Sequence, residues 1–349
     1  MRAKSSAGIQ GDSSHPDWPL LSKIDAAILT AFGGHERMSD FMAEMLRKVI
    51  DDVVDTAETG RRFIGEIEKT EKTYIGTKVE IVLRHKMGFP KGKVLDLLID
   101  GEEVDVKFTM GGRSGNWMVP PEAVGRPLLL VAASETENLC WVGLIVADMS
   151  KLSASANRDG KRTISQTGFD NIWWLIKGRA YEPNFWADIP QDIAAWAFDK
   201  EVSGSVRMMR LFRTMARKPI PRRVVKEVAQ QLDFMRRVRG NGGARDIIGP
   251  DMVILSDFMG SDAVRNLGLP PLPRNSFIAI DIRDAKERAI IEQSSQTRTT
   301  KGWAARRSKP KGPINSVRAE DHDVPFSFNN QADPDFDVTP AAATWSKDP

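Results

Sequence analysis

The sequence predicts an α/β fold for the first half of the chain and a mainly helical second half. Residues 20–57 repeat apolar positions every three to four residues, which is the period of an amphipathic helix. Residues 77–109 change to a period of two, which is typical of strands. Beyond residue 190 the helical period dominates again, in segments rich in arginine. A length of 349 residues fits about two such domains.

Composition excludes several classes of protein. The hydrophobic fraction is 41%, and no run of 18 apolar residues occurs that could span a membrane. The first 19 residues have no apolar core of a secretory signal. Cys140 is the single cysteine and lies in an apolar stretch, so we expect a core residue rather than a catalytic thiol. A disulfide framework is excluded, and the reducing cytoplasm is the expected compartment.

The N-terminal part is expected to be helical after a disordered start. Residues 1–17 are rich in serine and glycine and predict disorder. Two helices separated by Gly33-Gly34 account for the apolar spacing in residues 20–57.

The central part is expected to form the sheet. The period of two predicts strands at Lys78–His85, Lys93–Ile99 and Glu102–Thr109. Continuous apolar runs predict buried strands at Pro127–Ala133 and Cys140–Ala147. Helical spacing then resumes over Gly168–Lys177, and we place a domain boundary within residues 175–190.

The second half is expected to consist mainly of long helices. One is predicted over Ile193–Arg217, and another over Arg222–Arg239, which the glycines of residues 240–243 end. Phe277–Ile282 predicts a short strand. From about Ser294 the periodicity is lost, and the acidic end is predicted to be flexible.

Charge is segregated along the chain although the net charge is only +3. Residues 200–245 contain thirteen Lys and Arg residues against three acids, and residues 298–318 contain seven basic residues and no acid. Residues 320–337 contain six acids and no Lys or Arg. This distribution indicates a surface that binds a polyanion, followed by a polar tail.

Basic side chains of the second half are therefore candidates for contacts with DNA phosphates. The alternative for each is an ordinary solvated helix face. Gln230 and Gln231 are candidates for contacts with base edges. The basic candidates, of which the first four recur at helical spacing, are Arg207, Arg210, Arg213, Arg217, Arg222, Arg223, Lys226, Arg236, Arg237 and Arg239.

The most informative segment lies around Asp100-Gly101, which is a strong signal for a two-residue hairpin turn. If these two residues form the turn, the register pairs Leu97 with Val104, and next Asp96 with Asp105. Two aspartates would then face each other, with their Cβ atoms about 5 Å apart. Lys107 lies on the same face, while Leu95, Leu97, Val104 and Val106 should face the core.

Opposed carboxylates weaken a hairpin unless a cation lies between them. Mg²⁺ commonly takes one or two carboxylates and completes its shell with water and phosphate oxygens. Lys107 would orient or deprotonate the attacking water, or stabilise charge on a scissile phosphate. Glu80 interrupts an apolar strand pattern and needs a partner. The alternative is a surface hairpin with ordinary polar residues on its wet face.

Glu80, Asp96 and Asp105-Val106-Lys107 resemble the signature of the PD-(D/E)xK nucleases. Residues 76–81 and 104–108 in particular resemble the NaeI-like type II restriction endonucleases. Ile172-Trp-Trp-Leu175, Arg222-Arg-Val-Val225 and Val228-Ala-Gln-Gln231 extend this resemblance to roughly residues 20–290. The family usually has cysteine where this chain has Val106; the position faces the core, so we expect no loss of activity.

The resemblance implies a nuclease core of mixed sheet flanked by helices, and a DNA-binding domain related to helix-turn-helix or winged-helix folds. The expected boundaries are residues 18–178 for the endonuclease domain, 185–318 for the DNA-binding domain and 319–349 for the tail. It implies catalysis by Glu80, Asp96, Asp105 and Lys107, with Mg²⁺, or Mn²⁺ as a substitute, on the three carboxylates.

The resemblance also implies partners. They are double-stranded DNA in two copies (substrate and effector), a second copy of the chain in a homodimer, and a cognate DNA methyltransferase in the host.

Other functions remain open or are disfavoured. A non-catalytic DNA-binding regulator on a nuclease scaffold is the main alternative, although the intact Asp/Asp/Lys set argues against it. A topoisomerase-like enzyme needs a tyrosine, and Tyr74 and Tyr181 have no basic setting. The four histidines lack zinc-ligand spacing, and the glycines of residues 240–243 do not form a phosphate loop. The Trp and Met residues Trp173, Trp174, Trp196, Met208, Met209 and Met215 are expected in the core.

Overall fold

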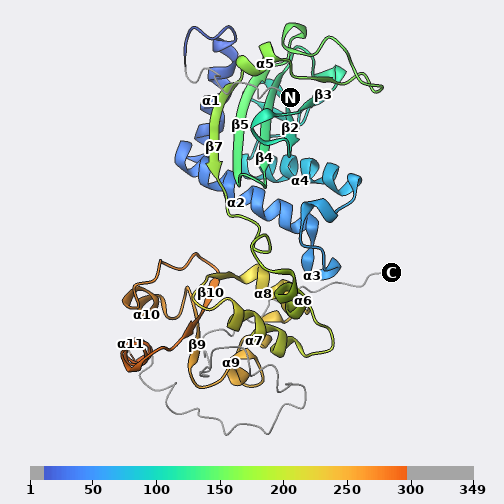
Figure 1. Cartoon of the computed structure of the whole chain (residues 1–349). Coiled ribbons are helices and arrows are strands. Elements are labelled where there is room, and N and C mark those ends of the chain that lie inside the picture. The colour runs from blue at the N-terminus through green and yellow to red at the C-terminus, as the bar shows by residue number, and fades with distance from the viewer. Residues whose placement is uncertain (1–11, 297–349) are drawn as a thin grey trace, which may run out of the picture. The chain divides into compact units, whose positions relative to one another are not determined.

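The computed structural model describes residues 12–296 and divides into two compact units (Figure 1). The first takes in the described residues up to Asp55 and Arg61–Ala187; the second takes in Thr56–Gly60 and the described residues from Asp188 on. The predicted acidic tail lies outside the described residues. No helix within residues 12–296 is long and apolar enough to cross a membrane.

The two N-terminal helices are confirmed. Helix α1 spans Trp18–Phe32 and α2 spans His35–Val54. Between them, Gly33 and Gly34 have φ angles of 76° and 114°, a region that side chains with a Cβ rarely adopt. Structure begins earlier than predicted, because His15 is buried and its ring bonds to the carbonyl of Asn171.

The predicted strand over Lys78–His85 is wrong, because these residues lie within helix α4, Lys69–Met87. The buried residues of α4 are Ile75, Val79, Leu83 and Met87, which recur every four residues. Ile81, the apolar residue that completed the alternating pattern, is exposed. Burial in this segment therefore follows a helical period of about four residues. The alternation of apolar residues over 79–83 is a coincidence of sequence that resembles a strand.

A five-stranded sheet forms the centre of the first unit, in the order β1-β2-β4-β5-β7. Strands β2 and β4 run parallel and the other neighbours antiparallel, so the predicted mixed sheet flanked by helices is confirmed. The bounds are Leu97–Ile99 for β1, Glu102–Thr109 for β2, Pro127–Ser134 for β4, Leu139–Val146 for β5 and Trp173–Ala180 for β7.

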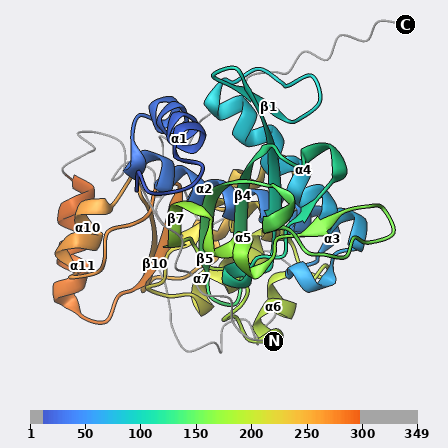
Figure 2. The same ribbon diagram turned by 90° about the horizontal axis from the view of Figure 1, so that it is seen from above.

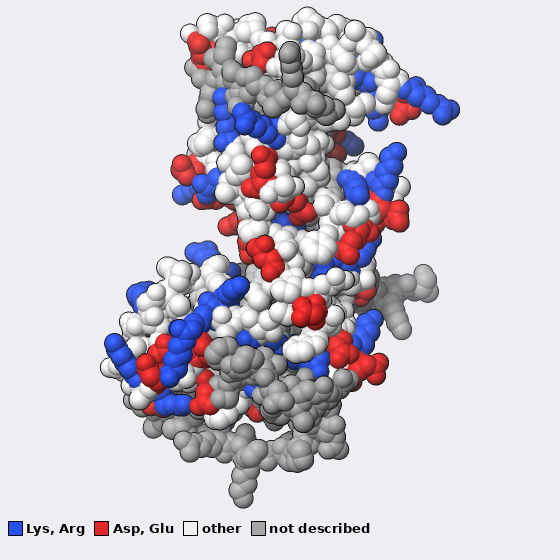
Figure 3. All heavy atoms as spheres, viewed as in Figure 1, with Lys and Arg blue, Asp and Glu red and all other residues white. Residues whose placement is uncertain are grey.

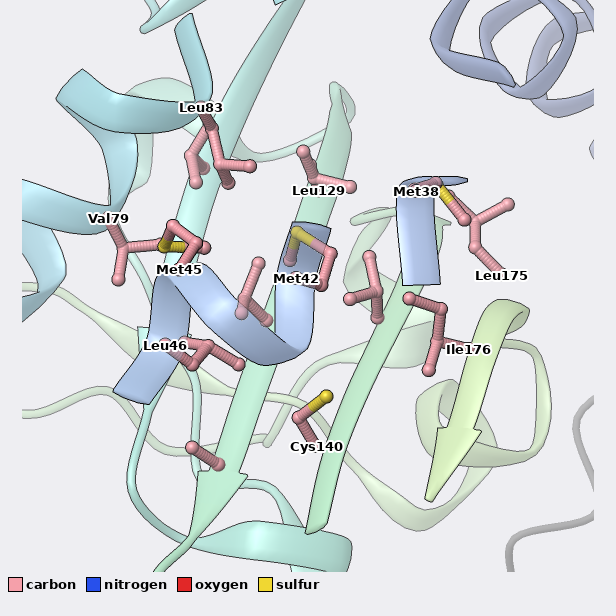
Figure 4. Packing of buried hydrophobic residues seen from close by; sticks show 14 of the residues in the cluster. Met38, Met42, Met45, Leu46, Val79, Leu83, Leu129, Cys140, Leu175 and Ile176 are labelled. Atoms are coloured by element: carbon pink, nitrogen blue, oxygen red, sulfur yellow. The ribbon is translucent and has the colours of Figure 1, made fainter. Parts of the chain in front are cut away.

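The sheet has a buried core on each face. Helices α1, α2 and α4 cover one face, where Met38, Met42 and Met45 of α2 meet strand residues such as Leu129 and Cys140 (Figure 4). The second core contains Trp117, Phe169 and Trp174 with alternate residues of β4 and β5. A small sheet of β3 (Met118–Val119) and β6 (Arg162–Thr163) lies in this second layer.

The helix predicted over Gly168–Lys177 is also wrong. A short helix, α5 (Gln166–Asp170), is followed by strand β7 from Trp173. Trp173 and Trp174 are buried on opposite faces of the sheet, in the first and second cores respectively. The segment forms a strand because it pairs with the edge of β5. Its continuous apolar run supplies buried side chains to both faces of the sheet, as is usual for a buried strand.

The second unit is more divided than the sequence predicted. Its helices are α3 (Thr56–Thr59), α6 (Gln191–Ala197), α7 (Gly204–Thr214), α8 (Arg222–Ala229), α9 (Ala244–Ile247), α10 (Ser261–Asn266) and α11 (Ala285–Gln296). Its sheet has the order β8-β10-β9, with bounds Ile220–Pro221, Ser276–Asp281 and Met252–Ser256.

Short 3-10 helices occur in both units. Those of the first unit are Ile64–Glu66, Gly112–Ser114, Pro121–Ala123 and Met149–Lys151, and the second unit has one at Phe234–Arg237.

The long helices predicted in this unit are wrong for local reasons. Residues 193–217 break after Ala197, and α7 restarts with Ser203 as its N-cap, whose hydroxyl accepts from Val206 N. Helix α8 stops because Gln230 adopts a left-handed conformation with φ of 51°. The strand predicted at Phe277–Ile282 is confirmed as β10, whereas β9 was not predicted.

Candidate active site

The hairpin register is confirmed. Leu97 pairs with Val104, Leu98 with Glu103 and Ile99 with Glu102, around a turn of Asp100 and Gly101. Both turn residues have positive φ, 51° and 89°, as the predicted turn type requires. The sequence therefore determines which residues of β2 share a face.

Asp96 lies one residue before β1, and not within a strand as predicted. Lys93 N and Val94 N donate to the carboxylate of Glu103 instead of to a neighbouring strand, which ends the ladder early. As a result, Leu95 leaves the face of Leu97 and packs in the second core, which corrects its predicted position. Asp96 still reaches β2, because its Oδ2 accepts from Val106 N at 2.8 Å.

Asp105 and Asp96 meet through their carboxyl groups, as the register predicts. Asp105 is only 4% exposed. Burial, and then the neighbouring Asp96, raises the pKa of Asp105 to about 7, although Lys107 acts in the opposite direction. One buried acid is thus held where its charged form is costly unless a cation is near.

Lys107 lies on the same face of β2 as Asp105. Its Nζ is 2.7 Å from Asp105 Oδ2 and 3.3 Å from the carbonyl oxygen of Val106. Its side chain is 22% exposed, while Val104 and Val106 are buried in the core under α4. Lys107 therefore contacts the buried carboxyl group of Asp105 while part of its own side chain is exposed to solvent.

Glu80 approaches this pair from α4, which packs against β2. Figure 2 shows α4 next to the sheet. Burial, and then the charge of Asp96, raises the pKa of Glu80, while Arg84 and Lys91 lower it. Glu80 Oε1 accepts from Arg84 Nη1 at 2.8 Å, one helical turn away. The structure thus brings Glu80 to the site on a helix, with its carboxylate turned to an arginine.

The donor set fits a divalent cation held by two carboxylates. Asp105 Oδ2 is buried and makes an ion pair but no well-formed hydrogen bond. Within the described part of the chain, no three or more His, Cys, Asp or Glu side chains converge closely enough to hold a metal ion. Two carboxylates with water and phosphate oxygens are a usual shell for Mg²⁺. Asp96 and Asp105 satisfy that requirement, and Glu80 would join only after leaving Arg84.

Most of the residues that were expected in the core are buried. Burial raises the pKa of Cys140 to about 12, so a reactive thiolate is excluded there. Met208, Met209 and Met215 are buried as expected. Trp196 is 45% exposed, against expectation, and the guanidinium of Arg210 lies over its ring.

The arginine ridge of α7 is mostly internal. Arg207, Arg210 and Arg213 are all less than 10% exposed. Arg207 donates to four backbone carbonyls, and Arg210 pairs with Asp199. Arg217, farther along, pairs with Asp281 and Glu287. Their guanidinium groups serve the folding of this unit.

The remaining basic candidates lie nearer the surface. Lys226 and Arg236 are exposed, and Arg222, Arg223, Arg237 and Arg239 are partly exposed. Gln231 bonds within the unit to Arg237 and to the carbonyl of Asp233, and Gln230 forms the end of α8. On the face shown in Figure 3, acidic and basic side chains are intermingled over both units.

Arg84 and Lys91 lie close enough to Glu80 to lower its pKa, and the sequence analysis did not single them out. The strand assignment placed Glu80 and Arg84 on a flat ribbon, where residues four apart are not in contact. A helical assignment would have shown the Glu-Arg pair at once, because residues four apart adjoin on a helix.

The chain is similar to known restriction enzymes over most of its length. A family model described as Restriction endonuclease NaeI matches residues 29–306. The type II restriction enzyme NaeI of Lentzea aerocolonigenes is 36% identical over 257 residues, which cover 71% of this chain and 80% of that protein.

These similarities define the class of the protein: it is a type II site-specific deoxyribonuclease, which binds double-stranded DNA and cleaves it in a sequence-specific manner. Within that class the chain belongs to the NaeI restriction endonuclease family. Enzymes of this class generally need a divalent metal ion.

Proposed function

We propose that the β1–β2 hairpin is the cleavage site and that hydrolysis of the phosphodiester requires Mg²⁺. The observation that carries this proposal is the contact of two carboxyl groups, Asp96 and Asp105, with Lys107 ion-paired beside them. A pairing that is unfavourable without a cation is consistent with a binding site for one.

Each side chain then has a distinct role. Asp96 and Asp105 would hold the cation, and a bound Mg²⁺ would supply Lewis acidity at the scissile phosphate. Lys107 donates to the attacking water or to the phosphate oxygen on which charge develops. Glu80, on α4, would be a further ligand of the cation if its carboxylate turned away from Arg84.

The second unit is proposed to bind DNA as a winged-helix-like domain. Its order of helices and strands supports this: α7, β8, α8, α9, β9, α10 and β10 follow one another, with β10 between β8 and β9 in the sheet. The exposed residues Lys226 and Arg236 are the first candidates for phosphate contacts. Phe258, near the start of the long connection between β9 and β10, is 63% exposed.

Assembly and activation complete the proposal. A homodimer that is activated by a second, effector DNA follows from the resemblance to the NaeI-like enzymes. So does a host methyltransferase that protects the cognate sites, with both enzymes in the cytoplasm. Sedimentation measures whether the protein is a dimer, and cleavage of a substrate with and without an added cognate duplex measures activation.

The metal requirement is the direct test of the cleavage site. Supercoiled plasmid DNA incubated with protein should be cut with Mg²⁺ or Mn²⁺ and left intact in excess chelator. With Ca²⁺ we expect binding without cutting, because Ca²⁺ is larger and tolerates looser geometry. Full cleavage in excess chelator would exclude the proposed site, whereas binding without cleavage in any metal would indicate a non-catalytic regulator.

A further inference from the structure

A cleft opens beside the proposed cleavage site, on the side of Glu80 that faces Arg84. It has a volume of about 400 Å³ and is lined by Ile81, Arg84, His85, Gly88, Phe89 and Lys91. Its charged or titratable lining groups can all be cationic, and no acidic side chain is among them. The nearest carboxylate in contact with a lining residue is Glu80, through its hydrogen bond to Arg84.

The cleft is built from two connected walls. One wall is the last turns of α4, where Ile81, Arg84, His85 and Gly88 share a face because they lie three and four residues apart. The other wall is the segment that follows, which is tied to the hairpin of the site, since Leu98 N of β1 donates to Pro90 O at 2.8 Å.

The segment that follows the cleft is also held firmly. A Cβ at Gly92 would lie 2.7 Å from the carbonyl oxygen of Leu95, so only glycine fits there without rearrangement. Glu103 of β2 accepts from the next two backbone N–H groups, those of Lys93 and Val94. The position of Lys91 is therefore coupled to that of Asp96, five residues farther along the chain.

The chemistry of the lining matches a deoxyribose-phosphate unit. Arg84 and Lys91 offer donors and positive charge to phosphate oxygens, and His85 offers a ring N–H. Ile81 is 45% exposed and Phe89 is partly buried, and together they offer an apolar surface to the sugar. A lining that combines basic and apolar side chains is suited to a nucleic-acid backbone more than to a free inorganic anion.

We propose that this cleft binds a backbone phosphate of the cleaved strand next to the scissile one, and so positions the DNA on the metal site. The inference rests on the proposed function of the hairpin. Arg84 links the two sites: without ligands it pairs with Glu80, and with DNA it pairs with the phosphate and leaves Glu80 to the cation. Arg84, His85 and Lys91 are thus positioning residues.

The test uses the full chain and two alanine variants, Lys91→Ala and His85→Ala, with Lys86→Ala as the matched control. Lys86 is exposed on the same helix but points elsewhere, over the ring of Phe41. We expect KM for a cleaved duplex to rise about 3- to 10-fold in the first two variants, with a salt slope lower by about one for Lys91→Ala. Lys86→Ala should match the wild type in both quantities.

A second measurement identifies the phosphate. Single methylphosphonates, which are neutral, are introduced in turn along the cleaved strand around the mapped cut. One position near the cut should weaken wild-type binding in Ca²⁺, and Lys91→Ala should be insensitive at that position alone. If Lys91→Ala keeps the wild-type sensitivity at every phosphate, or has the KM of the Lys86→Ala control, the inference is overturned.

Failure of the inference differs from failure of the proposed function. If Lys107→Ala abolishes cleavage while the phosphate scan shows no coupling to Lys91, the hairpin is the cleavage site and the cleft is not a phosphate site. If Lys107→Ala cleaves normally, the proposed function itself fails, and the inference with it.

Discussion

Buried charges are treated in opposite ways in the site hairpin and in the second unit. In the hairpin, the buried Asp105 faces another carboxyl group, and its pKa is raised to about 7. In the second unit, the buried Arg207 is surrounded by carbonyl oxygens, and Arg217 has two carboxylate partners. The hairpin keeps two carboxyl groups in contact, whereas the second unit surrounds the guanidinium groups of Arg207 and Arg217 with oxygen acceptors.

The difference indicates which charges serve stability and which serve the reaction. A buried charge with a complete set of partners gains nothing from a ligand, and its removal leaves those partners unsatisfied. A buried carboxyl with a like-charged neighbour costs stability until a cation arrives. Charge in the sequence alone does not distinguish the two, since both regions are rich in ionisable residues.

The largest effect we expect is on cleavage in Lys107→Ala. The rate should fall by roughly 10²-fold or more, by analogy with the loss of one preorganised donor. Its side chain is partly exposed and lies away from the apolar core, so unfolding and DNA binding should change little. Single-turnover cleavage, with unfolding in urea as the control, measures this. Cleavage near the wild-type rate would place the nuclease site elsewhere.

Removal of the buried guanidinium group of Arg207 should lower stability, in contrast to Lys107→Ala, which should mainly affect cleavage. Arg207→Met retains much of the side-chain volume but leaves four carbonyl groups without their donor, so we expect a loss of about 3 kcal/mol in the free energy of unfolding. Lys226→Met, an exposed change in the same unit, should stay within about 0.5 kcal/mol. Urea denaturation of the three proteins compares them; equal midpoints would show that the Arg207 network does not stabilise the unit.

Relief of the conflict should stabilise the hairpin. The pKa of Asp105 is higher in the folded chain than its ordinary value of 3.8, so its stabilising contribution is complete below about pH 4 and is lost as the pH rises through about 7. Asp105→Asn should therefore be inactive yet melt higher than the wild type at pH 8 without metal, by roughly 2–4 °C for each kcal/mol relieved. The two melting temperatures should converge near pH 4. A lower melting temperature of the variant at pH 8 would show that the charged Asp105 does not destabilise the folded chain.

The same shift predicts how metal binding depends on pH. Below about pH 7 the cation must displace a proton from the Asp96–Asp105 pair, so affinity for Ca²⁺ should increase as the pH rises from 6 to 8. Titration calorimetry in two buffers of different ionisation enthalpy would detect the released proton. If the affinity does not vary over this range, the carboxyl group of Asp105 does not have the raised pKa on which this prediction rests.

The smallest effects should come from the exposed basic residues of the second unit. Lys226→Ala and Arg236→Ala should each weaken DNA binding a few-fold and lower the salt slope by about one, with little change in stability. Fluorescence anisotropy over a range of salt concentrations measures both quantities. An unchanged slope in both variants would remove these residues from the proposed DNA surface.

The hairpin and its register could be predicted from local signals. Asp100-Gly101 fixes a two-residue turn, and a period of two then assigns Asp105 and Lys107 to one face without further information. The glycine pair that separates α1 from α2 and the apolar runs of β4 and β5 were equally local signals, and they were predicted correctly.

Features that depend on distant partners could not be predicted from local patterns. Glu80 lies on a helix because Val79 and Leu83 pack in the core beneath α4, whereas its neighbours in sequence also fit a strand. Trp173 begins a strand because β5 offers a partner edge. The arginines of α7 have the spacing of an exposed ridge, yet carbonyl groups up to 35 residues away enclose them. A local pattern records periodicity, but burial and pairing are set by segments that meet only in the folded chain.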